Sequence, residues 1–314
     1  MQKKRLLTGV QPSGALHIGN YLGALRPFVS MYGEYESMLM IADYHALTTL
    51  KDPAQIRENI LNAVRDYVAV GVDPKRVIIF QQSAVQAHTE LAWILECQVT
   101  VPFLMQAHAY KDKVAKGLES NAGLFAYPML MAADILMYDT DVVPVGQDQK
   151  QHVEYAREAA AKFNMAYGDT FKEPEEKILR SVAIVPGTDG KKMSKSYGNT
   201  IPLFGTRDEV HKAVMSIITD SKGESPENVY AIHRLIKDET EIASLYKSNK
   251  GKYKVLKDAL AADIEALVAP MRERRESISD ADVIRILKDG AEKAREHAEA
   301  KMQIVRRKVG VLLA

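Results

Sequence analysis

The sequence predicts an α/β protein: a parallel sheet with helices on both faces, followed by an all-helical C-terminal part. Over roughly the first 200 residues, short apolar runs bounded by turn residues alternate with amphipathic stretches, as in a parallel sheet. After about Phe204 the strand pattern stops and helical spacing takes over. The chain has 314 residues, 46% hydrophobic and 26% charged, which is typical of a soluble globular protein with one large domain or two ordinary ones.

Three apolar runs in the first part are expected to be buried strands, at residues 5–10, 37–43 and 76–83. Between the second and third runs, a helix is predicted to begin at Pro53, with Asp52 as its N-terminal cap. Gly71 stands just past the end of this helical pattern, as is typical of a helix C-terminus. In parallel sheets, ligands bind at the carboxyl ends of the strands. We therefore expect the active site on loops that lead from strands into helices.

Five stretches in the last third show helical spacing, at residues 207–220, 227–236, 240–248, 254–276 and 281–313. Two basic clusters on these stretches, 272–275 and 306–308, stand beside acidic residues and are expected to be solvated faces. Earlier in the chain, Trp93 is expected to belong to a helix core together with Leu91, Ile94 and Leu95.

Charge and cysteine content exclude several classes of protein. The 42 Lys and Arg nearly balance the 41 Asp and Glu, so any polyanion must be bound by a local basic patch. The single cysteine, Cys97, excludes an internal disulfide and a cysteine-based metal site. With no signal-peptide pattern and no run long enough for a membrane span, we expect a cytoplasmic protein without a membrane partner.

The segment GVQPSGALHIGN, residues 9–20, follows the first predicted strand. A strand that turns into a helix presents free N–H groups to an anion, most naturally a phosphate. The glycine spacing matches neither the P-loop nor the dinucleotide fingerprint, so His17, Gly19 and Asn20 are the candidates to bind it, as two side-chain hydrogen-bonding groups and a residue without Cβ. The alternative is that the glycines only make a tight turn and His17 caps a helix.

The segment DGKKMSKSYGN, residues 189–199, holds three lysines between glycines. In adenylyl chemistry, mobile cations that close over the leaving pyrophosphate stabilise the transition state more than the ground state. The flanking glycines would let this lysine strip open and close as a lid. The alternative is a solvated basic loop.

A third candidate site lies in YPMLMAADILMY, where Tyr127, Met131 and Asp134 share one side of an apolar helix start. A carboxylate among apolar neighbours needs a partner. The indole N–H, a donor without acceptor function, would suit an acceptor-only carboxylate. A salt bridge to a structural arginine is the alternative, and the residues alone do not separate the two.

The spellings HIGN at 17–20 and KMSKS at 192–196 resemble the two signatures of class I aminoacyl-tRNA synthetases. HIGN departs from the commoner HIGH at Asn20, a change found in the tryptophan and tyrosine subgroup. Residues 123–164 look like the amino-acid pocket and the following strand and helix of the tryptophan-specific members. Residues 9–14, 42–48 and 188–196 also resemble segments of those members. The resemblance covers residues from about Leu6 to Ser221.

This resemblance implies a Rossmann-like catalytic domain with a helical insertion over residues 1–203 and a helical, tRNA anticodon-binding domain over 204–314. It implies a homodimeric ligase that joins L-tryptophan to ATP and then to tRNA(Trp). Magnesium would arrive on the ATP phosphates, since the sequence offers no carboxylate cage for a resident metal.

The resemblance also implies residue roles. The catalytic residues would be His17, Asn20, Lys111, Lys192 and Lys195. ATP would be bound by Gln11, Ser13, Gly19, Asn20, Gly146, Asp148, Val182, Lys192, Met193, Ser194 and Lys195. Tryptophan would be bound by Leu7, His45, Tyr127, Met131, Asp134, Val143, Val145 and Gln149. Leu7 stands where Phe is often found in the family, Gln147 stands where Glu is common, and a core position is the alternative for His45.

Three other functions remain open at this point. A tyrosyl-tRNA synthetase shares both signatures, and a phenol can also be bound by a carboxylate. A cofactor-making nucleotidyltransferase shares the turn around His17, but has no need of the pocket around Asp134 or of a helical appendage. A non-catalytic RNA-binding relative is the third alternative.

Overall fold

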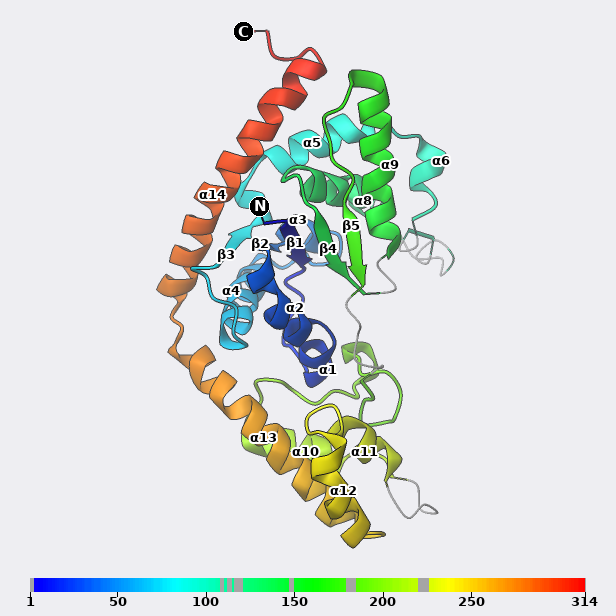
Figure 1. Cartoon of the computed structure of the whole chain (residues 1–314), viewed down its shortest axis with the longest axis vertical. Helices are drawn as coiled ribbons and strands as arrows, with labels where there is room; N and C mark the ends of the chain where they lie inside the picture. The colour runs from blue at the N-terminus through cyan, green and yellow to red at the C-terminus, as the bar shows by residue number, and fades with distance from the viewer. Residues whose placement is uncertain are drawn as a thin grey trace.

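The computed structural model describes residues 3–107, 110–111, 115, 121–146, 150–178, 185–219 and 226–313. Its centre is a five-stranded parallel sheet in the order β3-β2-β1-β4-β5 (Figure 1). The strands are β1 Arg5–Val10, β2 Glu36–Ile41, β3 Val77–Gln81, β4 Val142–Val145 and β5 Glu175–Ile178. The predicted parallel sheet and its first three strands are confirmed.

Strand β2 shows why the sheet could be recognised in the sequence. It pairs with β1 from Arg5↔Glu36 to Val10↔Ile41, and with β3 on its other side. All of its residues after Glu36 are buried. Strands of a parallel sheet are covered on both faces, so they form continuous apolar runs rather than alternating ones.

The helices of residues 1–203 connect the strands and cover the sheet. They are α1 Ile18–Asn20, the π-helical η1 Tyr21–Leu25, α2 Arg26–Met31, η2 Tyr32–Glu34, α3 Asp43–Ala46, α4 Pro53–Ala69, η3 Gln82–Ala84, α5 Ala87–Glu96, α6 Val101–Leu104, α8 Ala122–Leu136, α9 Lys150–Tyr167 and η5 Lys195–Tyr197. Helix α4 begins as predicted, because the Asp52 side chain accepts hydrogen bonds from the N–H groups of Ala54 and Gln55. Gly71 follows its end with φ at +114°.

The helix after β1 widens into a π-helical turn over η1, which ends two residues before Pro27. Proline has no N–H and its ring clashes with the carbonyl four residues earlier, so a regular α-helix is disfavoured on the N-terminal side of Pro27. The wider turn avoids that clash, and such turns are frequent at functional sites.

Helix α8 begins earlier than the sequence indicated. The Asn121 side chain accepts a hydrogen bond from Leu124 N–H and caps the helix, so Pro128 lies inside it. The predicted helix start at Tyr127 is therefore wrong. Tyr127, Met131 and Asp134 still share one face, because helical spacing does not depend on where the helix begins.

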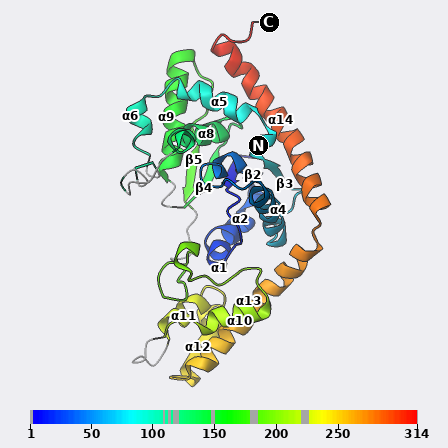
Figure 2. The same cartoon turned by 180° about the vertical axis from the view of Figure 1, so that it is seen from behind.

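The five helices predicted for the last third are confirmed with small shifts of their ends, as α10 Arg207–Met215, α11 Glu227–His233, α12 Glu239–Ser248, α13 Tyr253–Ser277 and α14 Asp280–Lys308. Figures 1 and 2 show that α14 leaves the helical end and runs back along the sheet beside β3. Gly290 permits this contact, since a Cβ there would lie 1.9 Å from the Ile79 carbonyl oxygen of β3. Ala294, Ala298 and Met302 of α14 join the core that contains Phe80.

Two expectations about surface and core are wrong. Trp93 is 68% exposed, because α5 buries the face that carries Leu91 and Leu95 and Trp93 projects from the opposite side. Two arginines of 272–275 are engaged rather than free in solvent: Arg274 Nε donates to Ala69 O, at 2.8 Å, and Arg275 Nε donates to Asp66 Oδ1, at 2.6 Å. These two arginines connect α13 to α4, although Arg274 stays exposed, while Arg272 pairs with Glu265 of α13 itself.

Arg306 in the second basic cluster is likewise engaged, because its guanidinium is paired with Glu90 of α5 at 2.7 Å. Among the helices the structure describes, none is both long and apolar enough to cross a lipid bilayer.

Candidate active site

A cavity of about 720 Å³ opens at the carboxyl ends of β1, β2 and β4, where the parallel sheet predicts ligand binding. Its walls bring together residues from several separate segments. Those predicted from the sequence are Leu7, Gln11, Ser13, His45, Tyr127, Met131, Asp134, Val143, Val145 and Gly146. Most of the wall is apolar, and Asp134 is the carboxylate in it.

Asp134 is 2% exposed and is held by three side chains. His45 Nε2 lies 2.8 Å from Oδ2, and Gln82 Nε2 donates to Oδ1 at 2.8 Å. His88 Nδ1 lies 2.7 Å from Oδ1. The side chains that contact the carboxylate of Asp134 are thus two histidines and a glutamine, and the described chain places no arginine there, contrary to the alternative interpretation.

These contacts keep Asp134 ionised. Burial alone raises the pKa of the carboxyl, but hydrogen bonding and charge from His45 and His88 outweigh burial and lower the pKa to about 2. The cavity therefore presents a fixed negative charge at neutral pH.

The turn after β1 forms a reciprocal cap around His17. Asn20 N–H donates to His17 Nδ1, at 3.3 Å, and His17 N–H donates to Asn20 Oδ1, at 3.1 Å. Because Nδ1 accepts, the neutral ring carries its proton on Nε2. Burial, assisted by the Lys195 ammonium, lowers the pKa of His17 to about 4, so the ring is neutral and offers Nε2–H as a donor. The alternative interpretation, that His17 caps a helix, is therefore correct for Nδ1. The Nε2–H group is not used by this cap and remains a possible donor to a ligand.

The lysine strip packs directly on this turn. Met193 Sδ lies 3.3 Å from Gly19 N, and Lys195 Nζ donates to the carbonyls of Ser13, at 3.0 Å, and Gly14, at 3.2 Å. Any Cβ at Gly19 would lie 2.9 Å from His17 Nδ1 and 3.2 Å from Met193 Sδ. Glycine is therefore required where the two motifs meet.

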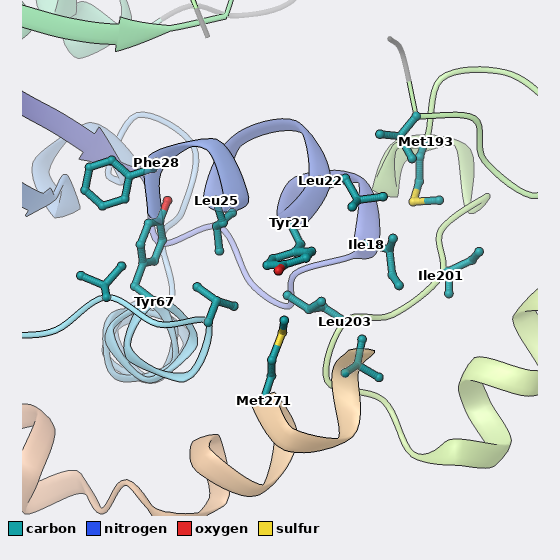
Figure 3. Close-up of a cluster of buried hydrophobic side chains, with 14 of the residues drawn as sticks. Ile18, Tyr21, Leu22, Leu25, Phe28, Tyr67, Met193, Ile201, Leu203 and Met271 are labelled. Carbon is teal, nitrogen blue, oxygen red and sulfur yellow. The ribbon is translucent and has the colours of Figure 1, made fainter. Parts of the chain in front are cut away.

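An apolar cluster beneath the turn holds the two motifs together. Figure 3 shows Met193, Ile201 and Leu203 gathered with Ile18 and Leu22 of the turn. The chain after the strip is also fixed by its backbone, since Ile18 N–H donates to Ile201 O at 2.9 Å. This packing keeps the strip next to the loop of Ser13, which lines the cavity.

Some predicted site residues stand apart from the cavity wall or outside the described residues. His17, Gly19, Asn20 and the strip residues Lys192, Met193, Ser194 and Lys195 lie beside the cavity but are not among its lining residues. Lys111 is exposed. Asp148, Gln149 and Val182 lie outside the described residues.

Four buried polar residues near the site were missed by the sequence analysis. Gln82, His88 and Tyr138 lie behind Asp134 and are at most 1% exposed, and Asn199 at the end of the strip is 2% exposed. Gln82 directly follows β3, a position at the carboxyl edge of the sheet that could have drawn attention to it. No sequence pattern indicated the other three.

Asn199 joins the two halves of the lysine strip. Its Nδ2 donates to Asp189 Oδ1, at 2.6 Å, and to Lys192 O, at 3.1 Å, while its Oδ1 accepts from Ser194 N–H at 2.8 Å. The backbone carbonyl of Asn199 accepts from Thr188 N–H at 2.9 Å. The strip is therefore a folded loop around one buried amide, not an unstructured basic segment.

Replacing Asn199 by alanine should loosen the strip, because the Ser194 N–H loses its acceptor and Lys192 O loses its donor. We expect tryptic cleavage after the strip lysines to become about tenfold faster, as local opening becomes more favourable. Mass spectrometry of a tryptic time course measures this. Tyr197→Phe, at a side chain 66% exposed in the same loop, is the matched control. An unchanged cleavage rate in Asn199→Ala would contradict the role given to this amide.

Comparison with known proteins places this site in a family. The model for tRNA synthetases class I (W and Y) matches residues 1–279. A tryptophan–tRNA ligase from Fusobacterium nucleatum subsp. nucleatum is 47% identical over 320 aligned positions, covering 98% of each chain. The crystal structure of a tryptophanyl-tRNA synthetase from Campylobacter jejuni, complexed with ADP and tryptophan, is 42% identical with a TM-score of 0.92, covering 98% of this chain and 99% of that chain.

A tyrosyl-tRNA synthetase from Archaeoglobus fulgidus, complexed with L-tyrosine, matches at 21% identity with a TM-score of 0.65, covering 88% of this chain and 90% of that chain, a likeness of fold alone. The family model and the relatives above 40% identity each span most of the sequence. The chain therefore belongs to the class I tRNA synthetases of the tryptophan and tyrosine subgroup.

Proposed function

We propose that this protein activates L-tryptophan with ATP, releasing pyrophosphate, and transfers the tryptophanyl group from the adenylate to the 3′ end of tRNA(Trp). The observation that carries this proposal is a buried, ionised carboxylate in an apolar cavity that reaches the loop beneath the lysine strip. The carboxylate would select the amino acid, and the strip would act on the phosphates.

The donors around Asp134 favour an indole over a phenol. A carboxylate has about four lone-pair sites; His45 and Gln82 hydrogen-bond to two of them, and His88 Nδ1 lies 2.7 Å from Oδ1 and crowds a third. One acceptor site remains, which is what a donor-only indole N–H requires. The phenol of a tyrosine substrate is also an acceptor, so its oxygen would need a donor in the pocket. His45, Gln82 and His88 already direct their protons to Asp134.

The other walls suit the rest of the substrate. Met131 supplies a polarizable surface for the indole ring, and Val143 and Val145 line its pocket. We assign the substrate ammonium to Tyr127 and Gln149. We assign Gln11 and Ser13, which follow β1, to the adenylate, with Gly146, Asp148 and Val182 as further ATP-binding residues.

The chemistry requires no covalent intermediate with the enzyme. The tryptophan carboxylate attacks the α-phosphorus, a carboxyl oxygen–phosphorus bond forms, and the bond to the β-phosphate oxygen breaks as pyrophosphate leaves. The protein aligns the reactants and neutralises the developing charge through His17 Nε2–H, Lys192 and Lys195, with Lys111 and Asn20 in supporting roles. In the second step a ribose hydroxyl of tRNA attacks the carbonyl carbon and AMP leaves.

ATP would enter as its magnesium complex, so the metal arrives with the substrate. In the described parts of the chain, no group of three or more His, Cys, Asp or Glu side chains is placed to hold a metal ion. Mg²⁺ commonly keeps water and phosphate ligands in such reactions.

For the larger organisation, we propose that residues 204–314 bind the tRNA anticodon and that residues 1–203 carry catalysis in a cytoplasmic enzyme. Because α14 packs on β3, the two parts share a core. Phosphate contacts by the helical part would make tRNA binding strongly dependent on salt.

Pyrophosphate exchange into ATP, measured separately with each of the twenty amino acids, tests the function. We expect exchange with tryptophan and none near that level with tyrosine. Equal or faster exchange with tyrosine would assign the enzyme to the tyrosine branch, and exchange without any amino acid would indicate a nucleotidyltransferase. Absence of exchange would favour a non-catalytic relative, a conclusion that single-turnover aminoacylation of a tRNA(Trp) transcript would check.

A homodimer is part of the proposal, supported by exposed large apolar side chains on α5, on α6 and directly after α6. Trp93, Val101 and Met105 are 68%, 59% and 48% exposed. Such side chains are typical of surfaces that a partner covers. Trp93→Glu is expected to shift the protein from dimer to monomer in sedimentation equilibrium. Val255→Glu, on α13, should leave it dimeric; a dimeric Trp93→Glu protein would contradict this choice of surface.

A further inference from the structure

His88 is a buried histidine that lies behind the cavity rather than in its wall. It belongs to α5 and is 0% exposed. Asp134 and His45 line the cavity, but His88 does not. A fully buried imidazole with no contact to the cavity must act, if at all, through a neighbour.

Both ring nitrogens of His88 face polar atoms. Nδ1 lies 2.7 Å from Asp134 Oδ1, although its N–H direction departs from a linear hydrogen bond, and no other described group partners this nitrogen. Nε2 lies 2.8 Å from the Tyr138 hydroxyl. A carboxylate only accepts, so Nδ1 carries the ring proton, and in the neutral ring Nε2 accepts from Tyr138 O–H.

Aromatic neighbours fix the plane of this ring. His88 is stacked on Phe80, with centroids 6.1 Å apart and an interplanar angle of 24°. The Tyr138 ring packs against it at 5.5 Å. Phe80 and Tyr138 are almost completely buried, so the imidazole has little room to tilt or flip.

The two oxygens of Asp134 are therefore held differently. Oδ1 is fixed by Gln82 and His88, neither of which lines the cavity, whereas Oδ2 is paired with the cavity residue His45. Oδ1 is thus held from outside the cavity wall, and Oδ2 lies on the side of the cavity residue His45. A carboxylate without these contacts could rotate about its side-chain torsions.

We propose that His88 is a positioning residue for amino-acid selection: its Nδ1–H, oriented by Tyr138, holds Asp134 so that Oδ2 accepts the hydrogen bond from the substrate indole. This inference rests on the proposed function, in which Asp134 binds tryptophan. His88 itself contacts neither substrate nor nucleotide.

Two amide substitutions separate this role from simple space filling. The amide nitrogen of His88→Asn occupies the place of Nδ1 and can still donate to Asp134, whereas that of His88→Gln occupies the place of Nε2 and points toward Tyr138. We expect His88→Gln to raise the KM for tryptophan in pyrophosphate exchange about tenfold, with kcat and the KM for ATP nearly unchanged. His88→Asn should restore most of the tryptophan dependence.

Equal behaviour of the two amides, or equal changes in the KM values for tryptophan and ATP, would overturn the inference. If His88→Gln does not fold, as judged by thermal unfolding, Tyr138→Phe takes its place, because it removes only the hydroxyl that orients the ring. It should raise the tryptophan KM about threefold or more; an unchanged KM would also overturn the inference.

The failure of this inference is distinguishable from failure of the proposed function. If the unsubstituted enzyme shows tryptophan-dependent exchange and Asp134→Asn impairs its tryptophan dependence, then normal His88→Gln kinetics refute only the role of His88. If the unsubstituted enzyme shows no tryptophan-dependent exchange, the proposed function itself has failed.

Discussion

Replacing Asp134 by alanine is expected to raise the KM for tryptophan about a hundredfold in pyrophosphate exchange, while the KM for ATP changes little. The loss leaves the indole N–H without an acceptor in a buried site, and hydrogen bonds to charged groups contribute about 1.5–3 kcal/mol. It also leaves His45, Gln82 and His88 directed at an empty space. Steady-state exchange at varied tryptophan and varied ATP measures the effect.

Two further substitutions serve as controls for Asp134→Ala. Asp134→Asn keeps the volume but turns an N–H group toward donors or toward the substrate, so it should also weaken tryptophan binding. Met131→Leu, in the same cavity wall, conserves volume and polarity and should change the KM for tryptophan only severalfold. An Asp134→Ala enzyme with normal tryptophan dependence would remove the basis for the assigned pocket.

Replacing Lys195 by alanine is expected to lower kcat for adenylate formation about a hundredfold, with a much smaller effect on ATP binding. In the structure its ammonium rests on the carbonyls of Ser13 and Gly14, at the border of the cavity. In the proposed reaction Lys195 would stabilise phosphate charge that develops only as pyrophosphate leaves, and the loss of one such preorganised contact typically costs about 2.7–4 kcal/mol. Pre-steady-state adenylate formation and equilibrium ATP binding separate the two effects.

Two further variants test whether the effect of Lys195→Ala comes from its charge and from its position. Lys195→Arg keeps the charge but not the compact point geometry, so it should recover part of the rate. Lys247→Ala, on α12 in the helical part, removes one lysine far along the chain and should leave exchange unchanged. A fall in ATP affinity as large as the fall in rate would show that Lys195 binds the ground state instead.

The parts of the fold that the sequence predicted are those set by local signals. Strand β2 is a continuous apolar run because both its faces are buried, and α4 has Asp52 as a cap at its start and Gly71 just past its end. Helix α14 was recognisable as a helix from spacing, but its place beside β3 depends on Gly290, whose importance appears only when the strand backbone lies against it.

The features that the sequence did not predict depend on contacts between residues that only the folded chain brings together. Periodicity placed Trp93 on a helix but could not say which face of α5 meets α8. Arg275 and Asp66 are paired although they are far apart in the chain. Within the site, Asp134 was recognisable because a carboxylate among apolar residues is anomalous, while His88 became meaningful only when folding brought it behind that carboxylate.

The position of α14 against β3 bears on how the protein is made. The ribosome synthesises β3 long before α14, so this edge strand stays uncovered while most of the chain emerges. The unpaired backbone groups of an exposed edge strand can hydrogen-bond to strands of other chains. A nascent or prematurely terminated chain that stops before Asp280 is therefore expected to need chaperone protection, and to aggregate without it.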